Sequence, residues 1–139
     1  MLFSVLALTM ALNHAPCGAE ESRMKIRLKL GDTVLTATLI DSKTTRGFIS
    51  LLPLTLTLED YAGTEKISNL PKRLSTEGAP SGIDPSVGDI TYYAPWGNLA
   101  IFYRDFGYAS GLVILGKIDS GTEAFNVPSS VKVTIELIR

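Results

Sequence analysis

The stretch GDITYYAPWGNLAIFYRDF, residues 88–106, is the part of the chain from which the fold is best predicted. Two apolar runs flank a short turn, in which Pro95 suits the second position and Gly97 readily adopts a positive φ. The run LAIFY is apolar at both odd and even positions, as expected of a strand covered on both faces. The stretch therefore predicts a hairpin within a β-barrel.

Aromatic side chains are concentrated in the same stretch, which holds the chain's only Trp. Tyr92 and Tyr93 must point to opposite faces of a regular strand, so at most one is in the core and the other is available to a ligand or to solvent. Trp96 lies at the turn and presents a large apolar surface. It either contacts a partner or packs over the end of the barrel.

Alternating apolar residues predict further strands on both sides of this hairpin. Helical spacing after an N-cap at Asp41 or Ser42 predicts one short helix, and residues 119–127 predict a second helix or a turn. Seven or eight strands with two short helices indicate a mainly β protein with a closed barrel. The additional strands are expected at residues 24–30, 33–40, 54–60, 111–118 and 131–138.

The first residues differ from the rest of the chain. Residues 2–12 form an uncharged apolar run, which together with Ala19 as a cleavage site is typical of a secretory signal peptide over residues 1–19. This predicts a periplasmic or secreted domain at residues 24–139. Two alternatives stay open: a lipoprotein attached at Cys17, and an upstream extension to residue 23 with Met24 as the true start of a cytoplasmic protein.

Composition excludes several classes of function. His14 and Cys17 are the only His and Cys in the 139 residues, and both precede the predicted domain, which then holds no Ser/His or Cys/His triad, no His or Cys zinc site and no disulfide. No metal or cofactor is expected. A net charge of −1 gives no reason to expect a nucleic acid or a membrane as partner of the mature domain, and the oligomeric state is left open.

Three segments, in this order, resemble parts of the cyclophilins, and more closely the small bacterial proteins with a cyclophilin-like fold. KTTRGFISL at 43–51 resembles the first cyclophilin helix, and residues 88–103 resemble the strand pair that begins with Gly and ends in paired aromatics. LVILGKIDSGTEAF at 112–125 resembles the strand ending in Gly-Lys and the second helix. The resemblance implies a closed cyclophilin-like β-barrel of about eight strands over residues 24–139.

Cyclophilins isomerise the peptide bond before proline, which needs no nucleophile, general base or metal. The resemblance implies that an Arg donates to the prolyl nitrogen and that an apolar pocket holds the ring. Phe102 matches a pocket Phe of the family, but Ala100 stands where a Gln is expected, and Gly107 and Leu112 stand where a Trp and a His are expected. The family's Phe-His-Arg segment has no counterpart, so the resemblance favours the fold more than the activity.

Residues 61–88 show weak apolar periodicity, and STEGAPSGIDPSVGD at 75–89 is interpreted as a long loop, a common location for functional residues. Arg73, between the predicted helix and this loop, is the nearest substitute for the missing catalytic Arg, and Arg104 is a second candidate. The alternatives are a solvated Arg73 and a salt bridge from Arg104 to Asp105 or another neighbour. Glu59 and Asp60 end a strand, where capping of the next turn competes with an acid–base or metal role.

Three hypotheses about function follow. The first is a groove that binds a peptide or a small molecule through Phe102, Tyr61, Tyr93 and Trp96, with Arg73 beside it. The second is a divergent peptidyl-prolyl cis-trans isomerase in which Arg73 or Arg104 replaces the lost Arg. The third is a structural or partner-binding module that contacts another protein through Trp96.

Overall fold

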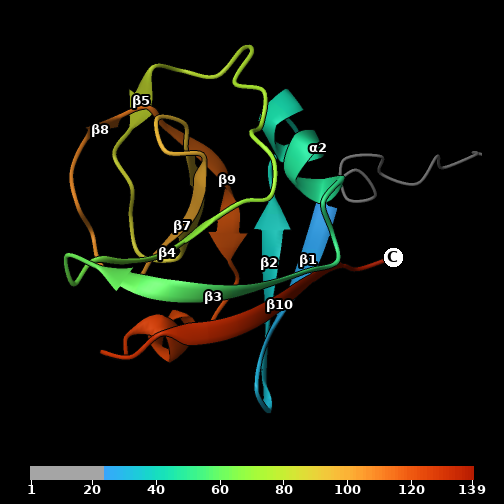
Figure 1. The fold of residues 1–139 in the computed structure, drawn as a ribbon, viewed down its shortest axis with the longest axis vertical. Helices are drawn as coiled ribbons and strands as arrows, with labels where there is room; N and C mark the ends of the chain where they lie inside the picture. The colour runs from blue at the N-terminus through green and yellow to red at the C-terminus, as the bar shows by residue number, and fades with distance from the viewer. Residues whose placement is uncertain (1–23) are drawn as a thin grey trace, which may run out of the picture.

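The computed structural model describes residues 24–139. Within this range, eight strands close into an antiparallel barrel in the order β1-β10-β3-β4-β7-β6-β9-β2 (Figure 1). The expectation of a mainly β, closed barrel is therefore confirmed. The barrel strands are β1 (Met24–Leu30), β2 (Thr33–Leu39), β3 (Leu54–Tyr61), β4 (Glu65–Asn69), β6 (Asp89–Tyr93), β7 (Asn98–Phe102), β9 (Leu112–Ile118) and β10 (Val131–Leu137).

Three smaller elements complete the described chain. The strands β5 (Gly82–Ile83) and β8 (Ala109–Ser110) form a separate two-stranded sheet. The helix α2 (Lys43–Ile49) begins after Ser42, whose side chain accepts a hydrogen bond from the Thr45 backbone N–H at 3.0 Å. Ser42 is thus the N-cap, and the second expected helix is a 3-10 turn, η1 (Thr122–Phe125). The signal-peptide prediction lies outside the described residues.

Side chains alternate between the two faces of each strand, and those on the inward face fill the barrel interior. Phe48 of α2 and Phe125 of η1 are fully buried against the same core. Tyr92 also points inward, and its hydroxyl accepts a hydrogen bond from the Leu74 backbone N–H at 3.1 Å. The fully buried aliphatic side chains of this core are Ile26, Leu28, Ala37, Leu58, Ile90, Leu99, Ile101, Leu115, Val133 and Ile135.

The strand β7 is covered on both faces, as its sequence predicts. Leu99 and Ile101 point into the barrel, whereas Ala100 and Phe102 form a second cluster with Leu112 on the outer face. The segment that follows β7 packs against this outer face, since Ala109 contacts the second cluster and the rings of Phe106 and Phe102 are neighbours. A barrel wall with apolar residues on its outside needs such a cover, and the cover creates a space between the two.

The weak periodicity of residues 61–88 predicted no strand there, but β4 and β5 lie in this range, and β5 interrupts the loop predicted at 75–89. The strand β4 pairs with β3 and β7 as part of the barrel. Its sequence, EKISN, lacks apolar alternation because Lys66 occupies an inward position that an aliphatic residue normally takes. The turn before it is held by Asp60 Oδ2, which accepts from the Gly63 backbone N–H at 3.1 Å, so the expected capping is confirmed.

Candidate ligand-binding pocket

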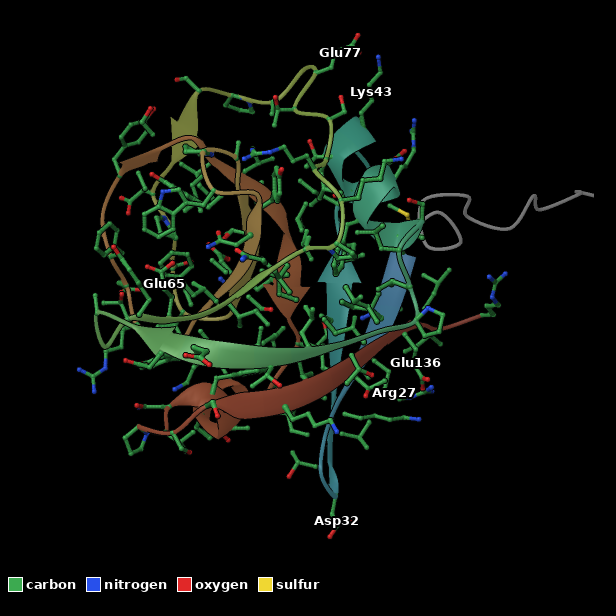
Figure 2. The ribbon with its side chains drawn as sticks, in the orientation of Figure 1. Arg27, Asp32, Lys43, Glu65, Glu77 and Glu136 are labelled. Carbon is green, nitrogen blue, oxygen red and sulfur yellow. The ribbon has the colours of Figure 1, made fainter. Side chains whose placement is uncertain are left out.

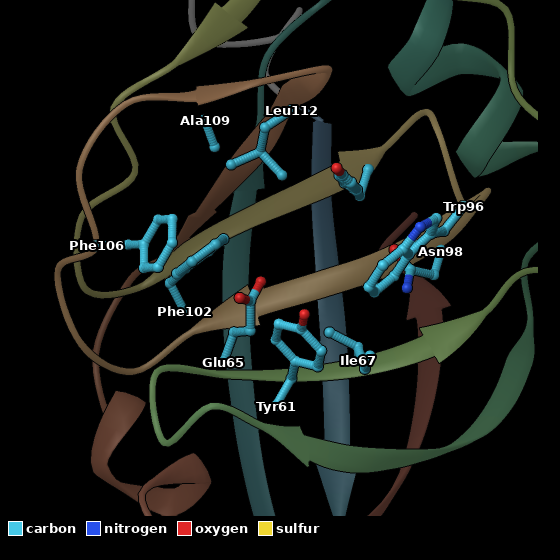
Figure 3. A pocket seen from close by; sticks show the side chains of 10 residues that line it. Tyr61, Glu65, Ile67, Trp96, Asn98, Phe102, Phe106, Ala109 and Leu112 are labelled. Atoms are coloured by element: carbon cyan, nitrogen blue, oxygen red, sulfur yellow. The ribbon is translucent and has the colours of Figure 1, made fainter.

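A pocket of about 180 Å³ lies on the outer face of the barrel, between β3, β4, β6 and β7 on one side and the segment after β7 on the other (Figure 3). Its floor is the outward face of β4 and β7, where Glu65 pairs with Phe102 and Ile67 pairs with Ala100. The ten lining residues are Tyr61, Glu65, Ile67, Tyr93, Trp96, Asn98, Phe102, Phe106, Ala109 and Leu112.

Aromatic rings form the rim of this pocket. The ring of Trp96 meets those of Tyr61 and Tyr93 edge to face, with centroids 5.6 and 5.2 Å apart. At the other end Phe102 and Phe106 lie 6.4 Å apart. Tyr61, Trp96 and Phe106 remain 43%, 52% and 54% exposed. Large apolar side chains this exposed around one concavity are typical of binding sites.

The four predicted ligand-binding residues, Tyr61, Tyr93, Trp96 and Phe102, all line this one pocket. They come from β3, β6, the β6–β7 turn and β7, so barrel closure brings Tyr61 to residues more than thirty positions later in the chain. Tyr93 points outward while its neighbour Tyr92 is in the core, as strand alternation requires. Gly97, with φ +70°, permits the turn that carries Trp96.

The two predicted catalytic arginines are not part of the pocket lining. Arg73 Nη1 donates to the Ala94 backbone oxygen at 3.0 Å, so Arg73 is tied to the turn that carries Trp96. Arg104 is exposed and its guanidinium carbon lies 6.0 Å from the centroid of the Tyr103 ring. Asp105 accepts from the Val87 backbone N–H at 3.0 Å instead of forming the expected pair with Arg104.

Glu65 is a pocket residue that the sequence reasoning did not find. Its side chain rises from the floor beside Phe102 and Tyr61 (Figure 3). Burial raises the pKa of its carboxyl to about 7, and the Thr64 hydroxyl lowers it in part. Within residues 24–139, no Lys or Arg nitrogen lies within 4.0 Å of its oxygens, although seven other ion pairs form there.

Asn98 is the second polar side chain that sequence reasoning missed. It opens β7, lines the pocket and is 3% exposed. Its Oδ1 is buried with no hydrogen-bond partner among the described residues. A polar residue at the start of an otherwise apolar strand is a sequence signal that could have identified it. Buried carbonyl oxygens are nearly always paired, so this one is available to a ligand donor.

The described residues therefore define a class: an antiparallel barrel with an aromatic-lined pocket on its outer wall. The chain belongs to the Cyclophilin-like family, whose model matches residues 28–136. The solution structure of a hypothetical protein from Archaeoglobus fulgidus is similar, with a TM-score of 0.56 and 18% sequence identity over 82% of this chain and 94% of that chain. This likeness shows the fold alone. A comparison with curated proteins found no match.

Between residues 24 and 139 no group of three or more His, Cys, Asp and Glu side chains is arranged to hold a metal ion. In the same range no helix is long and apolar enough to cross a membrane.

Proposed function

We propose that this cyclophilin-like barrel binds one ring-sized apolar group of a peptide or small molecule in the outer-face pocket. The observation that carries the proposal is the pocket's size and lining: about 180 Å³, with aromatic rings at both ends. A cavity of about 150 Å³ lined by apolar side chains is large enough to hold benzene. The pocket therefore suits a proline, phenyl or comparable ring, with the rest of the ligand outside.

Prolyl isomerisation is the second candidate function, and one observation favours it. Phe102, which matches a pocket Phe of the cyclophilins, lines the pocket. Catalysis also needs a donor that acts on the prolyl nitrogen in the transition state. Since Arg73 and Arg104 are not in the pocket lining, the remaining donors there include the hydroxyls of Tyr61 and Tyr93. Binding without catalysis therefore accounts for more of the pocket than catalysis does.

A titration of the full chain with capped Ala-Pro and Phe-Pro peptides and with benzyl alcohol tests both functions. The readout is the NMR spectrum, in which the indole N–H of the chain's only Trp reports directly on the pocket rim. We expect shifts of Trp96 and of the β7 amides that saturate at millimolar ligand. If no pocket resonance moves with any of the three, the proposal is wrong. Faster cis/trans exchange of the peptides would establish the isomerase.

A pocket-filling variant with a matched control makes the test specific. Ala109 lines the pocket, whereas Ser110, the next residue on β8, is exposed. Ala109→Leu should weaken binding at least about tenfold, because the added side chain occupies ligand volume. Ser110→Leu adds the same side chain outside the pocket and should leave binding unchanged. Equal effects of the two changes would place the bound ligand elsewhere.

A further inference from the structure

The pocket combines an aromatic wall with two oxygen acceptors, a carboxylate that no Lys or Arg of the described residues pairs with and an amide oxygen that has no hydrogen-bond partner among them. One is the carboxylate of Glu65 on β4, and the other is Oδ1 of Asn98 on β7. Their strand positions separate them, because Glu65 pairs with Phe102, four residues along β7 from Asn98. At about 3.3 Å per residue the backbone positions of the two residues lie roughly 13 Å apart along the strand direction. An acceptor therefore stands near each end of the pocket.

We propose that the ligand of this pocket carries an ammonium group on its apolar carrier, and that Glu65 binds this cation while the aromatic rings contact the carrier. The inference rests on the proposed function and names the ligand class. Ammonium groups only donate hydrogen bonds, and they complement both a carboxylate and an amide oxygen.

The ion pairs of other carboxylates in the molecule favour a cationic ligand over a neutral hydrogen-bond donor. Asp60, Asp89, Asp119 and Glu136 each pair with a lysine or arginine at 3.3 Å or less. Figure 2 shows one such pair, Arg27 with Glu136, well apart from Glu65 in the view. Glu65 is partly buried against aromatic rings, yet no cation of residues 24–139 pairs with it. A partly buried carboxylate without a cation is costly unless a ligand supplies one.

The aromatic rings of the pocket are the kind that attract cations. Trp faces are the best aromatic partners of ammonium groups and Tyr faces follow, at distances up to about 6 Å from the ring centre. Trp96 stands edge to face with both Tyr61 and Tyr93, so three rings with differently oriented faces surround one end of the pocket. Figure 3 shows Tyr61 directly beside Glu65, which joins the carboxylate to this aromatic group.

The ionisation of Glu65 should make binding of the cation depend on pH. Burial raises its pKa to about 7, so a bound cation and a proton compete for the carboxylate. Of the neighbouring ionisable groups, only the phenols of Tyr61 and Tyr93 line the pocket, and Lys66 faces the barrel interior. The groups on the elements packed against Glu65 are Glu59, Asp60 and Tyr61 on β3, Lys66 on β4, Tyr93 on β6, and Tyr103, Arg104 and Asp105 after β7.

The direct test compares benzylammonium with benzyl alcohol, two ligands of similar size that differ in charge. Affinity for the full chain is followed through Trp96 fluorescence and its indole N–H signal at pH 8. We expect benzylammonium to bind at least about tenfold more tightly, as a charge-assisted pair in a partly buried site does. Equal affinities would overturn the inference and leave the proposed function intact. Failure of both ligands to bind would count against the proposed function itself.

A pair of substitutions assigns the preference for benzylammonium to one residue: Glu65→Gln is the test and Glu59→Gln is the control. Glu59 lies on β3 opposite Ile67, is exposed and does not line the pocket, so both changes remove one negative charge from the same side of the barrel. Glu65→Gln should abolish the preference for benzylammonium and leave benzyl alcohol binding within about twofold. Glu59→Gln should leave both affinities unchanged. If the preference persists in Glu65→Gln, the cation binds elsewhere.

The pH profile provides an independent readout. Benzylammonium stays charged from pH 5 to pH 8, while a carboxyl with a pKa of about 7 is about 1% ionised at pH 5. Its affinity should therefore fall by up to roughly ninetyfold from pH 8 to pH 5, and benzyl alcohol affinity should not. The benzylammonium affinity of Glu65→Gln should not change over this range. Because this variant keeps His14, the chain's only His, a flat profile also shows that His14 does not cause the pH dependence of the wild type. A flat wild-type profile would contradict the inference.

The ammonium can come from a free amine or from a peptide, and a second probe pair distinguishes these sources. A capped Ala-Lys-Ala tripeptide is compared with the same peptide acetylated at the lysine Nζ, which removes the charge. Binding of the unmodified peptide, lost in Glu65→Gln, assigns the site to lysine-bearing peptides. Binding of benzylammonium alone assigns it to free amines. If neither cation is preferred over its neutral partner, the inference is wrong.

Discussion

Glu65 and Lys66 are neighbours on β4 that point to opposite sides of the barrel wall, and their surroundings are opposite as well. Lys66 faces inward, is 0% exposed, and its Nζ donates to Asp60 Oδ1 at 3.2 Å, to the Ser129 oxygen at 2.8 Å and to the Val127 oxygen. Glu65 faces the outer pocket and has no ion-pair partner among residues 24–139. One strand thus combines a satisfied buried charge with an unsatisfied one.

This difference separates a charge whose hydrogen bonds stabilise the fold, Lys66, from one that is left available to a ligand, Glu65. An ammonium has three N–H donors, and the interior supplies Lys66 with three oxygens, while the Tyr103 ring lies 5.6 Å from its Nζ. The Tyr103 hydroxyl also donates to Asp60, which closes the network. Nothing comparable is built around Glu65. The inner side contributes to stability, and the outer side has acceptors left for a ligand.

The largest expected effect comes from breaking the inner network. Lys66→Met should destabilise the protein by about 3 kcal/mol, because it removes one hydrogen-bond donor from each of three oxygens, on Asp60, Val127 and Ser129, at roughly 1 kcal/mol each. Urea unfolding of the full chain measures this. Lys132→Met on β10 is the control, since Lys132 is exposed, and its effect should stay within about 0.5 kcal/mol. A loss below 1 kcal/mol for Lys66→Met would mean that the network contributes little.

Removing the acid of the same network should have the next largest effect. The Tyr103 hydrogen bond is the main reason that the pKa of Asp60 lies below its usual value, with help from Lys66 and the Gly63 N–H. A lowered pKa means that this stabilisation is present above about pH 4 and is lost as the pH falls through the folded-state value. Asp60→Asn should cost about 1–3 kcal/mol at pH 7.

The same substitution should flatten the acid limb of the stability curve, recorded by thermal unfolding between pH 2 and pH 7. The wild type should lose stability steeply below pH 4, and Asp60→Asn should lose less over the same interval. Parallel curves for the two proteins would show that the Asp60 carboxylate does not carry the acid sensitivity.

The contribution of Glu65 to stability should depend on pH in the opposite direction to that of Asp60. The pKa of Glu65 is raised, so the folded state favours the protonated form, and the wild type should lose stability as the pH rises from about 4.5 to about 7. Glu65→Gln should therefore be about 1 kcal/mol more stable than the wild type at pH 8 and equal to it at pH 4, without ligand. A variant less stable than the wild type at pH 8 would indicate that an unseen partner already stabilises the ionised carboxylate.

The smallest effect is expected at Asn98. Because its Oδ1 has no partner in the described residues, Asn98→Val should change the free energy of unfolding by no more than about 0.5 kcal/mol, or increase it slightly. The same change should weaken the binding of benzylammonium if the ligand extends to this end of the pocket. Chemical unfolding at pH 7 measures the first effect. A loss above 2 kcal/mol would show that Asn98 makes a structural hydrogen bond.

The sequence predicted the strands in which apolar residues alternate or are apolar throughout. β7 is one example, and its double coverage indicated both a core and an outer apolar cluster. It also identified Tyr61, Tyr93 and Trp96 as candidates, because aromatic residues at strand ends and turns are recognisable without the fold, and Phe102 through the resemblance to the cyclophilins. All four lie in one pocket.

β4 and its two charges could not be predicted in the same way. In EKISN an inward lysine replaces the expected aliphatic residue, so the alternation that identifies a strand disappears. The partners of Lys66 lie 6, 61 and 63 residues away, and only the closed barrel brings them together. Glu65 was missed for the same reason. Arg73 was considered from its spacing alone, and its hydrogen bond to Ala94 O depends on the turn geometry.

The most direct test of the difference between the two sides of β4 is an NMR titration of the side-chain carboxyl carbons, with and without saturating benzylammonium. The account predicts that Glu65 titrates near pH 7 in the free protein and at least about one pH unit lower with the ligand, while Asp60 titrates below its usual value in both. A Glu65 carboxyl that titrates near 4.5 and does not respond to the ligand would contradict the account.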